Sequence, residues 1–182
     1  MKKALVATEA VQTKINMLDL DPIKVKLMDK DEGQGWTLAQ TNEIEKWYKR
    51  FLFLMLKHQD KSIVPNQLVD KFWHQHILDT RKYAEDCQYI FGFFVHHFPY
   101  FGMRGQEDEK NLRSSFDETN QIFLREFGEV MPATVEGAGK CNACGQGSCS
   151  HSGWCSKCDG GKKSMAVDVI NNRVRPTLAS VS

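Results

Sequence analysis

Apolar side chains recur at intervals of three and four residues along the first two thirds of the chain. The clearest case is the segment 37–58, in which Trp47, Phe51, Leu54 and Met55 would share one face of a helix. Sustained alternation of apolar and polar residues, which marks a half-buried strand, does not occur in the sequence. The pattern therefore predicts an all-α fold, with a compact multi-helix domain.

Residues that favour helix ends divide this domain into its predicted helices. Asp21 can cap a helix, and Pro22 suits the first helical position that follows it. Thr37 and Asp79 can begin further helices, and Gly128 suits the position just after one. The predicted helices span residues 5–18, 22–28, 37–58, 80–91 and 106–127, and between the third and fourth of these the chain restarts at Pro65-Asn66 and continues the apolar pattern at Leu68, Val69, Phe72, Trp73 and Ile77.

The composition changes after Pro132. Residues 137–161 hold five of the six cysteines and most of the glycines, with almost no aliphatic side chains. Such a segment cannot bury enough apolar area to offset the entropy of ordering it, so we expect it to be irregular unless a metal or disulfides tie it. The predicted organisation is a helical domain at 1–132, a small Gly/Cys-rich metal-binding segment at 133–161 and a flexible tail at 162–182.

Charge and hydropathy exclude several classes of protein. A net charge of +1 argues against a general nucleic-acid binder, which normally carries a strong basic excess. The apolar stretch near the N-terminus is too short for a signal peptide, and the longest apolar run, 51–56, is far below a bilayer span. We therefore expect a cytoplasmic protein with no membrane span, whose cysteines are reduced thiols or metal ligands.

Histidines crowd the sequence that follows Trp73. Imidazole and thiolate are the ligands that zinc and similar ions prefer. The candidate metal ligands of this region are four of the six histidines and one cysteine: His74, His76, Cys87, His96 and His97.

Helical geometry groups these candidates. If the helices before and after Asp79 are nearly continuous, His76 and Cys87 lie on one stripe, and we expect them to form the metal-binding pair. The short aromatic segment 92–99, predicted to be half-buried, can fold back toward them and bring further histidines. Asp70 lies four residues before His74 and can orient its ring.

A second interpretation needs no metal. Trp73, Phe91, Phe94 and Phe98 would form an aromatic core, with the histidines hydrogen-bonded at its rim. Cys87 would then be an inert buried thiol. The sequence leaves both interpretations open.

The C-terminal cysteines form a separate candidate site. Two Cys-x-x-Cys pairs frame a ten-residue spacer, and such pairs can close one tetrahedral Zn²⁺ site. The spacer is shorter than is usual in zinc fingers, and two candidate ligands are surplus. Disulfides in an exported form, or incidental cysteines in a low-complexity tail, are the alternatives. The candidate ligands are Cys141, Cys144, Cys149, His151, Cys155 and Cys158.

The segment from Val69 to Gly92 resembles the signature of the glycine-rich domain-containing protein-like family. That signature is similar to Val-Asp-x-x-Trp-His-x-His, a helix break, and then Tyr-x-x-Asp-Cys and a glycine. Plant and fungal members usually have Asn-Pro at the break, where this chain has Asp79-Thr80, and His96-His97-x-Pro99 is similar to a feature of bacterial relatives. The resemblance covers roughly residues 37–127 and implies a common helical module without an activity to transfer. The matching residues are Trp73, His74, His76, Tyr83, Asp86, Cys87 and Gly92.

The leading hypothesis is a cytoplasmic metal-binding interaction module, with zinc as the expected ion and an unknown protein as the expected partner. A metal-dependent enzyme that uses the central histidines is the alternative from another class. The sequence favours it less, since no paired carboxylates or base adjacent to the histidines stands out beyond Asp70, Asp86 and Glu85. A third hypothesis makes the helical domain a recognition unit for a modified or exported Cys-rich peptide tail.

Overall fold

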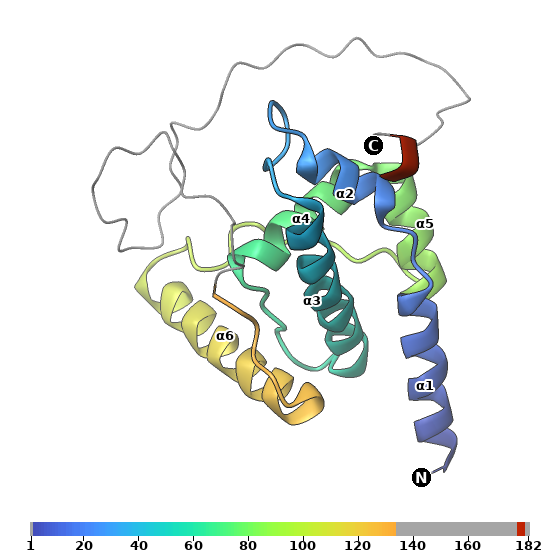
Figure 1. Ribbon diagram of the computed structural model, residues 1–182. Coiled ribbons are helices and arrows are strands. Elements are labelled where there is room, and N and C mark those ends of the chain that lie inside the picture. The colour runs from blue at the N-terminus through green and yellow to red at the C-terminus, as the bar shows by residue number, and fades with distance from the viewer. Residues whose placement is uncertain (1, 134–177, 181–182) are drawn as a thin grey trace.

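The computed structural model describes residues 2–133 and 178–180. These residues form six α-helices, one short 3₁₀ helix and no strand (Figure 1). The all-α prediction is therefore confirmed for this part of the chain, whereas the predicted irregular Gly/Cys-rich segment lies outside it. The elements are α1 (Lys2–Asn16), α2 (Asp21–Met28), α3 (Leu38–Lys57), α4 (Gln67–Leu78), α5 (Thr80–Phe91), α6 (Gln106–Phe127) and η1 (Leu178–Ser180).

Helix α3 is the central element of the domain. It packs against α1, α2 and α4, while α5 lies against α1 and α4 (Figure 1). Helix α6 joins this group through aromatic side chains, because the ring of Phe123 lies 6.0 Å from that of Trp47 and Phe127 lies 6.0 Å from Phe53. Trp47, Phe51 and Leu54 are buried as their spacing predicted.

Helix ends follow the predicted signals in most places. Thr37 begins α3 with a reciprocal capping box, in which its side chain and that of Gln40 each accept a backbone N–H of the other. Gly128 follows α6 in the left-handed conformation, as predicted. At α2 the predicted start was off by one residue, because Asp21 is the first residue of the helix and Leu20 takes the N-cap position, while Asp19 accepts the Asp21 N–H at 3.1 Å.

Asp79 separates α4 from α5. Its backbone leaves the helical region (φ −82°, ψ 72°), and its side chain accepts the N–H of Lys82 at 3.3 Å, so the predicted capping role is confirmed. The two helices are distinct elements. The continuous helix on which the predicted stripe of His76 and Cys87 depended is therefore not present.

A loop, residues 92–105, connects α5 to α6 and carries most of the exposed aromatic side chains. Phe94 is 45% and Phe98 55% exposed, so the predicted aromatic core is wrong at both positions. Trp73 is buried and Phe91 is only partly buried. The reason is that Trp73 alone fills the space against Phe51, with the two ring centres 5.2 Å apart. The loop lies outside Trp73.

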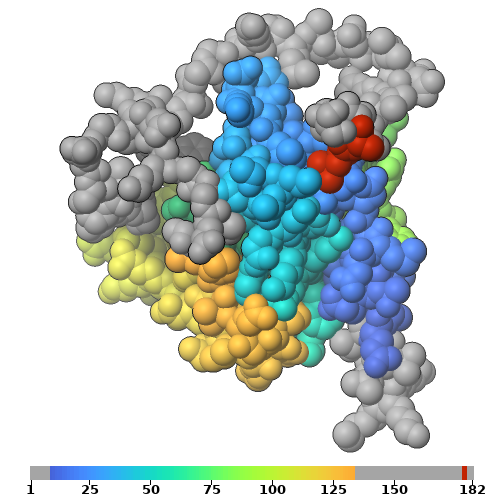
Figure 2. Space-filling view, in the orientation of Figure 1, coloured from blue at the N-terminus to red at the C-terminus, as the bar shows by residue number. Residues whose placement is uncertain are grey.

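The described C-terminal residues return to the helical domain. In Figure 2 the red 3₁₀ turn η1 lies against the blue residues of the N-terminal part, and its contacts are with α2. None of the helices in the described ranges is both long enough and apolar enough to cross a membrane.

Candidate metal centre

His76 lies at the junction of three helices and is 1% exposed. Its Nδ1 is 2.8 Å from the hydroxyl of Tyr48 on α3, and its Nε2 is 2.9 Å from Oδ2 of Asp86 on α5. Burial raises the pKa of Asp86, but hydrogen bonds from His76 and Lys82 outweigh burial and hold that pKa below its usual value. Both ring nitrogens of His76 therefore have protein partners, which tie α3, α4 and α5 together.

Cys87 is buried beside Tyr83, whose ring also contacts His76. The rings of His76 and Tyr83 meet edge-on at 5.1 Å, and the Tyr83 hydroxyl accepts the Trp73 Nε1–H at 3.0 Å and donates to the Val95 carbonyl at 2.7 Å. Burial raises the pKa of the Cys87 thiol, although hydrogen bonds with Val95 and Tyr83 act in the opposite direction. Cys87 is thus a protonated thiol at neutral pH. Metal binding by His76 and Cys87 stays a prediction. For an ion to bind there, His76 would have to give up a hydrogen bond to Tyr48 or Asp86.

A second group converges at the other face of α4. His74 Nδ1 lies 3.1 Å from Asp70 Oδ2, as the four-residue spacing predicted, and His97 Nε2 lies 3.4 Å from Asp70 Oδ1. The two imidazole rings are 4.5 Å apart, and one potential ligand atom from each of the three residues lies within 4.8 Å of the others. We call Asp70, His74 and His97 the Asp–His–His cluster.

Charge within this cluster favours an ionised carboxylate. Burial raises the pKa of Asp70, but the hydrogen bonds and charges of His74 and His97 hold it below its usual value. The hydrogen bond to Asp70 is the main reason that the pKa of His74 is raised. The carboxylate thus attracts positive charge, either a proton on His74 or a cation in place of that proton.

The spacing of the cluster suits a small divalent ion. Zinc bonds of 2.0–2.2 Å in tetrahedral geometry place ligand atoms about 3.3–3.6 Å apart. The separations of 3.1 Å and 3.4 Å are to the two different oxygens of Asp70, and one ligand atom from each of the three residues lies within 4.8 Å of the others. All three side chains are only partly buried, so an ion could reach them from the solvent.

The sequence prediction named two of these three residues as ligands. Asp70 was expected only to orient His74, although its spacing of one helical turn places both side chains on one face of α4. His97 was expected beside His76 and Cys87, whereas the loop places its ring 4.6 Å from Trp73 and against Asp70. His96 is exposed and contacts the ring of Phe94, outside the cluster. The tail candidates, Cys141 to Cys158, lie outside the described residues.

The cluster opens into a cavity of about 1300 Å³. This cavity lies between the segment 59–67, the first turns of α4, the loop 92–105 and Leu112 of α6. Aromatic and other apolar side chains of the loop form much of its wall, among them Phe93, Phe98, Tyr100, Phe101 and Met103. We call this cavity the aromatic pocket.

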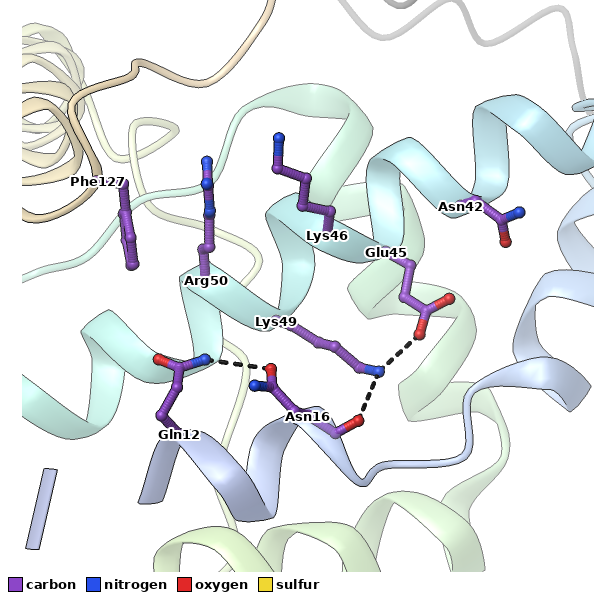
Figure 3. Close-up of a pocket in the computed structure, with 8 residues that line it drawn as sticks. All are labelled: Gln12, Asn16, Asn42, Glu45, Lys46, Lys49, Arg50 and Phe127. Carbon is purple, nitrogen blue, oxygen red and sulfur yellow. Dashed lines mark hydrogen bonds and ion pairs between the residues drawn. The ribbon is translucent and has the colours of Figure 1, made fainter. Parts of the chain in front are cut away.

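A smaller pocket, of about 580 Å³, lies between α1, α3 and the end of α6 (Figure 3). Lys49 donates to Glu45 at 2.7 Å and to the Asn16 carbonyl at 3.2 Å, and Figure 3 shows both contacts. Arg50 and Lys46 pair with Glu129. Because its cations pair with groups of the protein, this pocket is a polar seam between helices.

The fold and the cluster define an α-helical domain with a two-histidine, one-carboxylate group at the edge of an apolar pocket. The UCP032817-like family model matches residues 13–121, well over half of the chain, and the chain belongs to this family. The resemblance to the glycine-rich domain-containing protein-like family was therefore wrong, and of the residues that suggested it Trp73, His76, Tyr83 and Cys87 are buried in the core of this helical domain. Comparison with curated proteins and with solved structures gives no match.

Proposed function

We propose that the helical domain binds a divalent transition-metal ion, zinc first, through Asp70, His74 and His97. The observation that carries the proposal is the convergence of these three side chains within 4.8 Å at the wall of a large pocket. Two imidazoles and a carboxylate are a common set for zinc, with the remaining position open to water or a ligand. The domain would be a metal-dependent binding module.

The same arrangement supports the second candidate, a metal-dependent enzyme. An ion with three protein ligands and an open position can activate a bound water or polarise a carbonyl group. The observation that favours this candidate is the pocket that adjoins the cluster. We place metal binding ahead of catalysis, because the described residues supply a set of metal ligands but do not indicate which reaction would follow.

A separate zinc site in the tail remains part of the proposal and rests on the Cys-x-x-Cys spacing alone. The reducing cytoplasm is the compartment we propose, because free thiols and zinc thiolates persist there. A protein partner for the module is likewise a proposal.

Cobalt titration tests both sites in one experiment. The parent for the central site is the full-length chain with Cys141, Cys144, Cys149, Cys155 and Cys158 changed to Ser, here called the tail-serine protein. We expect it to bind one Co²⁺ with weak visible bands and without thiolate charge-transfer absorption. The unmodified chain should bind a further equivalent with strong charge transfer from the tail thiolates.

Variants of the tail-serine protein locate the central site. His97→Gln should weaken Co²⁺ binding by at least the 10–100-fold that loss of even an outer partner costs. His96→Gln is the matched control, because His96 is the neighbouring residue and lies outside the cluster. Equal affinity of the two variants, or no uptake by the parent, would remove the Asp–His–His site. A thiolate band that Cys87→Ser abolishes would place the ion at His76 and Cys87 instead.

A further inference from the structure

The aromatic pocket displays apolar surface of a kind that folded domains seldom expose. Phe98 is 55%, Tyr100 59% and Met103 75% exposed, and all three line the same cavity. Scattered exposed apolar residues need no explanation, but a contiguous group around a concave surface marks a binding site. The cavity of about 1300 Å³ exceeds the roughly 300–1,000 Å³ of usual ligand pockets, so a drug-sized molecule fits within it.

The charged groups around the aromatic pocket bear on which apolar ligand it would bind. Among the described residues that line the pocket, Asp70 is the one carboxylate, and the two cations, Lys61 and Arg104, are paired with Glu118 and Asp108 just outside the lining. A divalent ion on the Asp–His–His cluster would add further positive charge. The charge of that ion, rather than the paired cations, would favour an anionic ligand.

Arg104 lies over the ring of Phe98 and is held there by Asp108. Its guanidinium lies 5.0 Å from the centre of the Phe98 ring, and its Nε and Nη2 groups donate to Asp108 at 3.2 Å and 2.6 Å. Two of its three nitrogens thus hold the loop against α6. The ion pair fixes a planar cation beside an exposed aromatic ring, where a flat ligand can stack.

We infer that the aromatic pocket binds a small aromatic carboxylate. Its ring would pack against Phe98 and Tyr100, and its carboxylate would complete the coordination of the ion held by the Asp–His–His cluster. This inference rests on the proposed metal site and names the class of ligand that the site takes. An oxygen anion is a suitable fourth ligand for zinc bound by two imidazoles and a carboxylate.

Calorimetric titration of the zinc-loaded tail-serine protein with 2-naphthoate tests the inference. The neutral probe 2-naphthylmethanol has the same ring system and lacks the carboxylate. We expect saturable binding of 2-naphthoate, about tenfold weaker binding of the alcohol, and a similar loss when zinc is removed. Phe98→Ala should weaken 2-naphthoate binding by about tenfold if this ring is an anchor.

Tyr89→Ala is the matched control, because Tyr89 is also an exposed aromatic residue (45%) but lies on α5 outside the pocket. It should leave the affinity for 2-naphthoate unchanged. Equal binding of acid and alcohol, or equal effects of Phe98→Ala and Tyr89→Ala, would overturn the inference. Zinc uptake without 2-naphthoate binding would overturn it while leaving the proposed function in place. Failure to bind zinc would overturn both.

Discussion

Two histidines on α4, only two positions apart, have different environments. His74 is partly exposed and pairs with Asp70 at the pocket, whereas His76 is buried between Tyr48 and Asp86. The difference follows from the helix, because residues two apart lie about 200° apart around its axis. His74 therefore lies at the surface of the pocket, and His76 is part of the core.

This difference predicts opposite results for two alanine variants. His76→Ala should lower the free energy of unfolding by about 2 kcal/mol or more, since it leaves the buried Tyr48 hydroxyl without its partner and takes one partner from Asp86. His74→Ala should cost about 0.5 kcal/mol or less, because its ion pair is partly exposed. Urea denaturation of both variants measures the difference. A stable His76→Ala protein would contradict the structural role of His76.

At the scale of elements, the first turn of α6 holds the aromatic loop in place. Asp108 accepts the backbone N–H of Gly102 at 2.6 Å and that of Arg104 at 3.2 Å. Gly102 has a φ of 91°, and a Cβ there would lie 2.5 Å from Cδ2 of Leu112, so both backbone and space require glycine. The shape of the aromatic pocket thus depends on a contact between loop and helix.

The Asp108 contacts predict a pH dependence. Hydrogen bonding to Arg104 is the largest cause that lowers the pKa of Asp108 from 3.8 to about 2. A lowered pKa in the folded state means that the stabilisation is complete above about pH 4 and is lost as pH falls toward about 2. Asp108→Asn keeps the shape and removes the titrating group. Unfolding free energies measured between those pH values should therefore fall less steeply for Asp108→Asn than for the parent, and parallel curves would contradict this assignment.

The whole described domain has one apolar core, drawn from residues before 133. Helices α1 to α5 and the inner face of α6 all contribute to it, as is shown in chain order by Ile15, Ile23, Phe51, Phe72, Cys87 and Phe123. The chain after Pro132 adds the contact of η1 with α2. The Pro132 carbonyl itself accepts a hydrogen bond from Asn66 at 2.7 Å, which ties this end of the described segment to the start of α4.

The position of the core predicts that residues 1–132 fold without the tail. The truncated protein should unfold in a single cooperative transition with an m-value near that of the full-length chain, because the described core lies before residue 133. Leu178→Ala in the full-length chain serves as the control for the loss of η1, and should cost less than about 1 kcal/mol, since Leu178 is only partly buried. A broad transition with a reduced m-value in the truncated protein would show that the tail contributes to the core.

The sequence by itself determined the helices and most of their ends. The periodicity of Trp47, Phe51 and Leu54 and the caps Thr37 and Asp79 act between residues a few positions apart, so they can be recognised without a fold. The pairing of Asp70 with His74 belongs to the same class, because it needs only one helical turn.

Tertiary structure decided which histidines meet. His97 reaches Asp70 across 27 positions because the loop 92–105 turns back over Trp73, and no local spacing encodes that turn. His76 joined the core because α3 and α5 present Tyr48 and Asp86 to it from opposite sides. Contacts of this kind depend on how whole helices pack, and that packing is set by the summed burial of the core rather than by any short motif.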